Sequence, residues 1–308
     1  MKLAIKTLIF TLMLFTLASA QQMADTSFLP EINNPTWESG SGPTVMIDEA
    51  HNNFHTASGR YLPFAQLLRR DGYTVEPFKQ RFTKETLKDV DILVIANALH
   101  PSNVNDWSLP TLGAFSMLEA GWVQKWVKAG GSLLFITDHM PFPGAALELG
   151  KAFKVAFHNG FAMDTLKTGP TIFRTSDSTL LSHPVVTGRD STERVDSIAT
   201  WTGQAFFTKI PNFVPLMVFD SGYVSLTPQE AWEFDENTGV KDVEGWFQGG
   251  VMELGKGRVA IFGEAAMFTA QVVHVEGEES RKAGMNAPQG AQNTQFLLNV
   301  MRWLSRKI

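Results

Sequence analysis

Three short apolar runs constrain the fold of this chain more than any other feature of its sequence. They are TVMID at 44–48, ILVIA at 92–96 and SLLFIT at 132–137. Each is too short for a typical helix and almost free of polar residues, as expected of strands in a sheet covered on both faces. Amphipathic helical patterns at 59–70 and 112–129 separate the runs. This alternation predicts an α/β fold with a mostly parallel sheet, helices on both faces and right-handed crossover connections.

Weaker patterns predict the rest of the fold. Two apolar runs flank Gly255-Lys256-Gly257, a hairpin signal, and a strongly amphipathic stretch closes the chain. The polar region 158–245 is rich in Gly and Pro and is interpreted as an irregular insertion, which can be a lid, an interface or a sheet extension. The remaining expected elements are strands at 73–77, 213–220, 246–254 and 258–262, and helices at 84–88, 145–157, 264–273 and 292–305.

The N-terminus has the pattern of a signal peptide. Lysines precede an apolar run too short to span a bilayer comfortably, and Ala18-Ser19-Ala20 is a small-residue cleavage pattern. The mature protein is then exported, to the periplasm or beyond the cell; an uncleaved N-terminal anchor is the alternative. The expected organisation is a signal peptide at 1–20, an extended leader at 21–42 and a single α/β domain at 43–308.

Composition narrows the chemistry and the partners. The chain has no cysteine, which excludes disulfides, cysteine nucleophiles and thiolate metal ligands. Its net charge is −5 and it has no basic run, which argues against nucleic acid and anionic membrane surfaces as partners. No later stretch is long and apolar enough for a transmembrane helix. Composition does not decide among a small-molecule, glycan or peptide ligand, and it does not indicate the oligomeric state.

Titratable side chains gather where the expected strands end. In open parallel sheets, ligands bind outside the carboxyl ends of the strands. If the strand order is of the flavodoxin type, the first, third and fourth strands are neighbours and their loops share one crevice. The residues at these ends are Asp48, Glu49, His51, Asn52, Asn53 and His55 after the first strand, His100 after the third, Asp138 and His139 after the fourth, and Glu264 after the last.

Several of these residues have a purely structural interpretation. Asp48 and Glu49 can cap the following segment or bind loop amides. His100 precedes a proline and can be a turn residue. Glu264 can serve only as a charge at a helix N-terminus. These interpretations compete with the functional one at each position.

The histidines and the fourth strand end are more specific signals. His51 and His55 lie four residues apart, a spacing that occurs in metal sites, although the flanking HExxH pattern is missing. A surface or hydrogen-bonded role competes with ligation for both. Asp138 and His139 sit at a sharp strand-to-helix turn, and a charged residue that ends a buried strand is costly unless it is paired. This turn therefore favours a functional role.

A family resemblance rests on the order of strands and loops and on four segments: IDEAHNNFHT, AGGSLLFITDH, GKGRVAIFGEAAMF and NTQFLLNVMRWL. In these features the chain resembles the class I glutamine amidotransferase-like superfamily, in particular its poorly characterised exported branches. The resemblance covers most of 43–305 and implies a flavodoxin-like sheet. Amidotransferase members place a Cys on the elbow after a central strand, with His and Glu later in the chain. Here the elbow is Thr137-Asp138-His139, and Glu264 stands alone near the later pair. The resemblance therefore implies the fold and the site location but not thiolate chemistry.

Two functions of different classes fit these residues. The first is a hydrolase of a cell-envelope or extracellular substrate that uses carboxylates as acid and base, with or without a divalent metal of the Zn type. The second is a non-catalytic module that binds a ligand or partner in the same crevice. For the hydrolase, the candidate catalytic residues are Glu49, Asp138 and Glu264, the candidate metal ligands are Asp48, His51, His55 and His139, and further pocket residues are Asn52 and His100.

Overall fold

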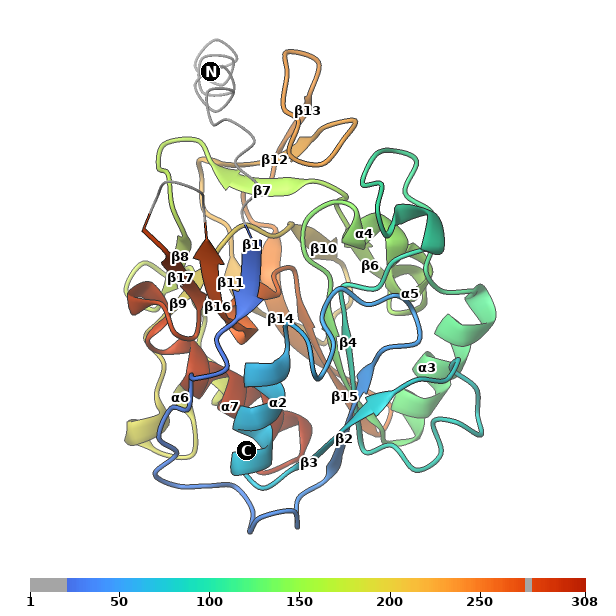
Figure 1. Cartoon of the computed structure of the whole chain (residues 1–308), viewed down its shortest axis with the longest axis vertical. Coiled ribbons are helices and arrows are strands. Elements are labelled where there is room, and N and C mark those ends of the chain that lie inside the picture. Colours follow the sequence, from blue (N-terminus) through green and yellow to red (C-terminus); the bar gives the residue numbers. More distant parts are fainter. Residues whose placement is uncertain (1–20, 275–278) are drawn as a thin grey trace.

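The computed structural model describes residues 21–274 and 279–308 (Figure 1). The expected signal peptide, 1–20, lies outside the described residues. A mixed central sheet carries helices on both faces, which confirms the predicted α/β class. Within the described part, no helix has both the length and the apolar character needed to cross a bilayer.

The parallel part of the sheet has the strand order expected of a flavodoxin-like fold. When the parallel strands are numbered along the chain, the second lies at the edge of the sheet. Next to it come the first, the third, the fourth and the last. The order reverses between the first and third strands, which is where ligands bind in such sheets. The five parallel strands, from the edge inward, are β3 (Thr74–Phe78), β2 (Thr44–Asp48), β4 (Ile92–Ala96), β5 (Ser132–Ile136) and β15 (Gly257–Phe262).

Antiparallel strands extend the sheet beyond its parallel part. The predicted hairpin around Gly255 is confirmed, because its two strands pair antiparallel from Gly249–Phe262 to Leu254–Gly257. Three more strands then pair onto the hairpin or onto one another, all of them from the region 145–245. The antiparallel strands are β14 (Phe247–Leu254), β10 (Phe206–Thr208), β6 (Val155–Phe157) and β11 (Phe213–Val218).

Alternate side chains of the buried strands enter two separate cores. Val94 and Leu134 belong to the core under α2 and α7, whereas their neighbours Leu93 and Leu133 belong to the core under α3. Burial on both faces explains why these strands read as continuous apolar runs. The helices are α2 (Leu62–Arg70), α3 (Met117–Ala129), α4 (Phe142–Ala145), α5 (Leu147–Ala152), α6 (Pro184–Thr187) and α7 (Asn293–Leu304), with 3₁₀ turns η1 (Pro101–Asn103), η2 (Ser191–Glu193), η3 (Ala266–Phe268) and η4 (Pro288–Gly290).

Two of the predicted helices are shorter than expected, and the one predicted at 84–88 is wrong. The helix predicted at 112–129 begins at Met117, because Ser116 and Glu119 form a reciprocal capping box at its start. The segment 84–88 consists of turns, and the Thr86 hydroxyl that donates to the Arg81 carbonyl competes with helical hydrogen bonds. The stretch 145–157 divides into α4 and α5 and ends as a strand of the sheet.

The prediction of a helix at 264–273 is wrong. Only the single turn η3 forms there, and the chain continues as β16 (Ala270–His274). β16 pairs on one side with β17 (Arg281–Gly284) and on the other with β1 (Gln21–Ala24). The expected extended leader therefore begins with a strand, and pairing with a partner about 250 residues away overrides local helical preference.

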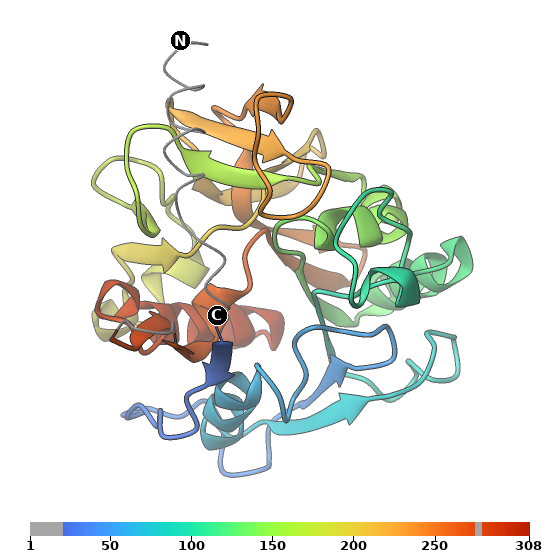
Figure 2. The ribbon, with the colours of Figure 1, turned by 45° about the horizontal axis from the view of Figure 1, so that its top comes forward.

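The insertion has more regular structure than predicted. It contributes a three-stranded sheet of β7 (Phe161–Asp164), β12 (Tyr223–Thr227) and β13 (Gly239–Asp242), and a pair of β8 (Thr171–Arg174) and β9 (Ser197–Thr200). Figures 1 and 2 both show β7 and β12 side by side at the top of the molecule. The insertion thus extends the main sheet with some strands and builds a separate small sheet with others.

Candidate functional site

The two histidines of the loop after β2, His51 and His55, lie in different surroundings. The His51 ring is buried between Phe82 and Phe115, with ring centroids 4.6 and 4.5 Å away. Its Nδ1 lies 2.9 Å from both carboxylate oxygens of Asp48, and its Nε2 lies 3.1 Å from Oε1 of Glu119. Both ring nitrogens are therefore occupied by carboxylates, and His51 joins the loop to the start of α3.

These carboxylates control the charge of His51. Burial of the ring opposes its protonation, but hydrogen bonds and charges from Asp48 and Glu119 outweigh burial and raise the pKa of His51. An imidazolium donates from both nitrogens, which matches two carboxylate acceptors. Arg81, 3.5 Å from Glu119, adds a partly exposed cation to the cluster. This arrangement ties loop to helix and leaves neither nitrogen free for a metal.

The second histidine lines a pocket at the carboxyl ends of the parallel strands. The cavity has a volume of about 180 Å³ and receives residues from the loops after β2, β4, β5 and β15, from β1 and β16, and from the insertion. The structure therefore brings together His55, Asp138, His139 and Glu264. The lining residues are Gln22, Phe54, His55, Asn97, Asp138, His139, Phe142, Trp201, Thr202, Trp232, Glu264, Ala266, Gln271, Val273 and Ala283.

Two buried carboxyl groups lie in this pocket. Asp138 is 7% exposed and Glu264 is 1% exposed. Asp138 Oδ1 accepts from the backbone N–H of His139 at 2.7 Å, and its Oδ2 accepts from Ala265 at 3.1 Å. Glu264 accepts from the N–H groups of Ala266 and Met267 at 2.9 and 2.7 Å. Both side chains are thus held in fixed orientations by the backbone.

Their proximity raises the proton affinity of Glu264. Burial, and then the negative charge of Asp138, raise the pKa of Glu264 well above its ordinary value, although three backbone N–H donors oppose the shift. Tyr61 is fully buried beside them, and its hydroxyl donates to the Ala265 carbonyl at 3.3 Å. Burial and the charges of Glu264 and Asp138 also raise the pKa of Tyr61 well above its ordinary value. The pocket thus contains a pair of carboxyl groups, and the charge of Asp138 disfavours ionisation of Glu264.

Two neutral polar groups complete the pocket. Burial, aided by the charges of Arg60 and His139, lowers the pKa of His55 to about 3, so its ring is neutral at physiological pH. Neither Nδ1 of His55 nor Nδ2 of Asn97 has a hydrogen-bond partner among the described residues, although both atoms are buried. An unsatisfied buried polar atom costs about 1–3 kcal/mol. Because such a cost needs an explanation, the two atoms in the pocket lining are candidates for contact with a ligand.

Aromatic side chains form the wall of the pocket. The His139 ring stacks on Phe161 at 4.6 Å and meets the edge of Trp232 at 4.7 Å. Nδ1 of His139 lies 2.7 Å from the Met140 carbonyl, which can only accept, so Nδ1 carries the proton. Trp232 is 50% exposed, and its backbone has a φ of +73°, a strained conformation for a non-glycine residue.

The other candidate residues serve the loops instead of the pocket. Asp48 pairs with His51, and Glu49 accepts from the Ala57 N–H at 2.9 Å, closing the loop. Asn52 donates to the Leu99 carbonyl, and His100 accepts from the Ser102 N–H at the start of η1. No group of three or more His, Cys, Asp or Glu side chains in the described residues is arranged to hold a metal ion. The four proposed ligands divide into the pair Asp48–His51 and the pocket residues His55 and His139.

Sequence reasoning named part of this pocket and missed the rest. Trp201 and Trp232 line the pocket, but the sequence gives them no periodic context, so core packing is the default interpretation for a tryptophan. Asn97 follows a buried strand directly, as Asp138 does, and the strand-end rule could have identified it. Gln22 reaches the pocket only because β1 pairs with β16. No local signal in the sequence indicates that pairing.

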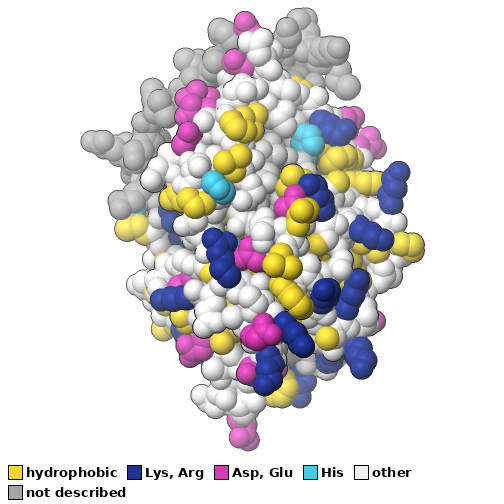
Figure 3. All heavy atoms as spheres, turned by 90° about the vertical axis from the view of Figure 1, so that its right-hand side faces the viewer, with side chains coloured by type: hydrophobic (Ala, Val, Ile, Leu, Met, Phe, Trp, Pro, Cys, Tyr) yellow, Lys and Arg dark blue, Asp and Glu magenta, His cyan; other side chains and the backbone are white. Residues whose placement is uncertain are grey.

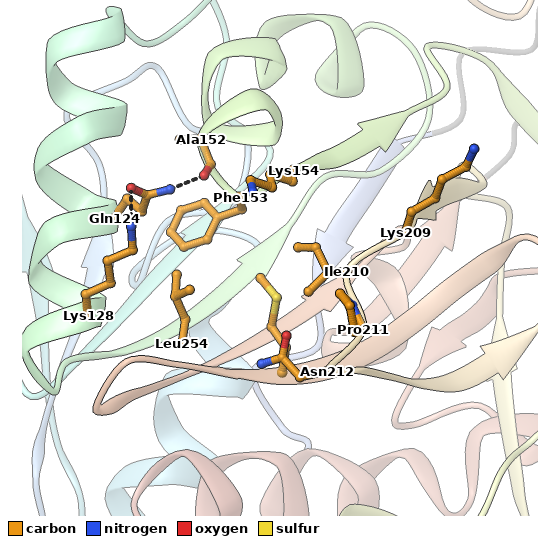
Figure 4. A pocket seen from close by; sticks show the side chains of 11 residues that line it. Gln124, Lys128, Ala152, Phe153, Lys154, Lys209, Ile210, Pro211, Asn212 and Leu254 are labelled. Carbon is orange, nitrogen blue, oxygen red and sulfur yellow. Dashed lines mark hydrogen bonds between the residues drawn. The ribbon is translucent and has the colours of Figure 1, made fainter.

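A second cavity lies on another part of the molecule. It has a volume of about 460 Å³ and an apolar floor that includes Phe153 and Leu254, with Lys128, Lys154 and Lys209 among its lining residues (Figure 4). None of the predicted site residues lines it. Figure 3 shows basic, acidic and hydrophobic side chains interspersed on the face that carries α3, so this face has no continuous basic surface.

Comparisons with known proteins concern the fold. No protein-family model matches the chain, and neither does any curated protein. The mmIFT52 N-terminal domain is 12% identical, with a TM-score of 0.56 over 85% of this chain and 97% of that one. A ThuA-like protein from Bacteroides uniformis has 11% identity and a TM-score of 0.43 over 90% and 94% of the two chains. A GMP synthase subunit from Thermoplasma acidophilum has 11% identity and a TM-score of 0.41 over 86% and 98%. The first likeness shows a shared fold alone.

Proposed function

We propose that this protein is a hydrolase whose acid–base pair is Glu264 and Asp138. The observation that carries the proposal is the burial of both carboxyl groups in one pocket, where burial and then the charge of Asp138 raise the pKa of Glu264. Two carboxyl groups whose surroundings push their proton affinities apart can act as acid and base at the same pH. A carboxyl group in a pocket whose pKa is strongly raised by burial and by a specific charged neighbour is a candidate catalytic acid.

In the proposed reaction, water attacks the scissile centre of a bound substrate. Asp138 accepts a proton from that water, and Glu264 donates its proton to the leaving group, so one water is consumed and one bond is cleaved. The proton on Asp138 then returns to Glu264 and restores the starting state. Acid–base catalysis of this kind contributes about 10²–10⁴-fold to a rate. His55 and Asn97 would hydrogen-bond to the substrate through their unpartnered atoms.

A metal-dependent version has less support from the geometry. His51 and Asp48 hydrogen-bond to each other, and His51 also to Glu119. Neither His51 nor Asp48 lines the pocket that contains His55 and His139. Metal-ligating histidines need a free nitrogen, and His51 has none. The carboxylate pair is therefore the better-supported chemistry, and metal analysis of the purified protein remains part of the test.

Membership and location are proposed on separate grounds. The strand order and the sequence segments at the strand ends support membership of the class I glutamine amidotransferase-like superfamily. The N-terminal pattern supports export to the cell envelope or the extracellular space, where the substrate would also be. N-terminal sequencing of protein recovered outside the cytoplasm tests export, and Gln21 as the first residue is the expected result.

A non-catalytic binding module is the second candidate. One observation favours it: both oxygens of Glu264 accept backbone N–H bonds. These bonds hold η3 in place, which is a sufficient structural role for Glu264 without catalysis. The two candidates are separated by assaying chromogenic esters, amides and glycosides with the wild type, Asp138→Asn and the surface control Asp89→Asn. Turnover that only Asp138→Asn loses supports the hydrolase. Turnover unaffected by Asp138→Asn, or no turnover at all, favours the binding module.

A further inference from the structure

The pocket residues also define what kind of molecule the pocket can hold. Resting on the proposed function, we infer that the ligand is one neutral hydroxylated ring of pyranose size, with Trp232 as the surface on which the ring stacks. The inference combines four properties of the pocket: its charge, its unpartnered polar atoms, its exposed aromatic wall and its volume. The charge, the polar atoms and the volume each disfavour a class of ligand, and the aromatic wall favours one.

The charge of the pocket disfavours anions. Asp138 and Glu264 both line it, and none of the described residues that line it is Lys or Arg. An anionic ligand would be brought beside a carboxylate in a poorly solvated space, which is costly. The cation that acts on His55, Arg60, lies over the Phe54 ring and is not among the lining residues. Phosphorylated and carboxylated ligands are therefore disfavoured. Cations remain attractive by charge alone, so a second property has to decide against them.

The unpartnered polar atoms require a ligand that accepts hydrogen bonds. Oδ1 of Asn97 accepts from the Asp138 N–H at 2.9 Å, which fixes the amide so that the unpartnered atom, Nδ2, is a donor. An ammonium group has only donors and would leave Nδ2 unsatisfied. A hydroxyl group both donates and accepts, so it can satisfy Asn97 and the neutral ring of His55 together. Vicinal hydroxyls on a ring meet this requirement at several positions at once.

The backbone at the pocket is strained in a way that suits ligand contact. Trp232 has a φ of +73°, in the left-handed region that bulky non-glycine residues rarely adopt. Strain of this kind persists where the surroundings enforce it and is concentrated at ligand-binding sites. At Trp232 the strain accompanies an indole that is half exposed, on a residue that lines the pocket.

The exposed indole of Trp232 fits the apolar face of a sugar ring. One side of its surroundings is fixed, because the ring contacts His139 and Phe161, each with a centroid distance of 4.7 Å. The indole is half exposed and belongs to the pocket lining, so it offers a flat apolar surface to a ligand. The C–H face of a pyranose can cover it while the hydroxyls at the ring edge face the polar atoms deeper in the pocket.

The volume restricts the ligand to a single ring. A cavity of about 180 Å³ is below the roughly 300–1,000 Å³ of pockets that enclose drug-sized ligands. At about 30 Å³ for each water in the liquid, it corresponds to about six waters. One monosaccharide unit therefore enters and the rest of a longer chain stays outside. A hydrolase with this pocket would act on the terminal unit of a glycan or glycoside.

Binding to defined probes tests the inference without requiring turnover. The neutral probes are glucose, galactose, mannose and N-acetylglucosamine, the anionic probe is glucuronate and the cationic probe is choline. Calorimetry and saturation-transfer NMR on the mature protein should show saturable binding of at least one neutral probe, with a Kd of about 1 mM, equivalent to about −4 kcal/mol. Choline or glucuronate binding more tightly than every neutral probe overturns the inference, as does the absence of saturable binding for all four neutral probes.

Variants of two tryptophans localise the contact. Trp232→Ala should weaken neutral-probe binding at least about tenfold, about 1.4 kcal/mol, whereas Trp232→Phe should retain part of the affinity. The matched control is Trp122→Ala, on α3 and outside the pocket, which should leave binding unchanged. Unchanged binding in Trp232→Ala, with an unchanged thermal transition, overturns the assigned platform.

The same experiments separate this inference from the hydrolase proposal. Sugar binding that depends on Trp232, without turnover of any ester, amide or glycoside, supports the inference and overturns the hydrolase. Turnover of an ester or amide that Asp138→Asn loses, without binding of any neutral probe, supports the hydrolase and overturns the inference.

Discussion

Asp138 accepts a hydrogen bond of 3.1 Å through Oδ2 from the backbone N–H of Ala265, the residue that follows Glu264. One peptide group therefore connects the loop after β5 with the loop after β15. The Tyr61 hydroxyl donates to the carbonyl of the same residue, Ala265, at 3.3 Å. The two carboxyl groups of the pocket are thus held by contacts from three loops, and we expect small changes at Asp138 to affect Glu264.

Asp138→Asn is expected to abolish most of the proposed hydrolysis. The amide cannot act as a base, so kcat should fall about 10²–10⁴-fold. It also presents an N–H to one of two backbone donors, His139 or Ala265, which costs about 1–3 kcal/mol of stability. Steady-state kinetics and urea denaturation measure the two effects. Asp89→Asn, at an exposed aspartate, is the control and should change neither quantity; wild-type kcat in Asp138→Asn contradicts the assignment.

The pH dependence of the rate should report the proton on Glu264. Because burial and Asp138 raise the pKa of Glu264, its acid form persists above pH 4.5, and kcat/KM should fall as pH rises through the raised pKa. In Asp138→Asn, the repelling charge is gone, so the same limb of the residual activity should move to lower pH. Carbon-13 NMR of labelled glutamate carboxyls provides an independent titration. An alkaline limb that does not move between the two proteins contradicts the coupling.

The parallel sheet was predictable because its physical signal is local. Strands such as β4 and β5 are buried on both faces, so each is apolar along its whole length. The short strands of the insertion have no such signal, because they are not buried along their whole length and β7 pairs with β12 about sixty residues later. Glu264 was predicted from its place after a strand, but the helix expected to follow it was not formed. There its carboxylate accepts from Ala266 and Met267, and the chain then pairs as β16.

The candidate site was predictable in position and only partly in membership. The strand-end rule placed His55, Asp138, His139 and Glu264 near one another, and all four line one pocket. It could not separate His51 from His55, because both lie in one irregular loop without helical spacing. His51 hydrogen-bonds to Glu119 in the first turn of α3. The sequence predicted the start of this helix at 112, whereas α3 begins at Met117. Such contacts depend on tertiary packing and have no signature in a single sequence.

His51 is expected to make the protein less stable at alkaline pH. Its folded-state pKa is raised above 6.5, so its contribution to stability is fully present below pH 6.5 and is lost as pH rises through the raised pKa. His51→Gln should therefore destabilise most below pH 6.5, by about 3 kcal/mol, since it leaves the buried carboxylate of Asp48 without its cation. The difference from wild type should shrink as pH rises. Urea unfolding across this range measures it, with His100→Gln at an η1 turn as the control; a difference independent of pH contradicts the ion pair.

His55, four residues later, is expected to act in the opposite direction. Its folded-state pKa of about 3 lies below 6.5, so the unfolded chain binds a proton that the folded protein excludes, and stability falls as pH falls below 6.5. The fall contributed by this one group is at most about 1.4 kcal/mol per pH unit. His55→Leu removes that proton uptake and also removes the unpartnered Nδ1, so the variant should be at least as stable as wild type at pH 7 and increasingly more stable between pH 6 and pH 4. Urea unfolding at each pH measures this difference, with His100→Gln again as the control. Wild-type and His55→Leu curves that run parallel over this interval would show that the His55 ring takes up a proton in the folded protein as easily as in the unfolded chain, and a neutral His55 could then no longer be assigned to the pocket.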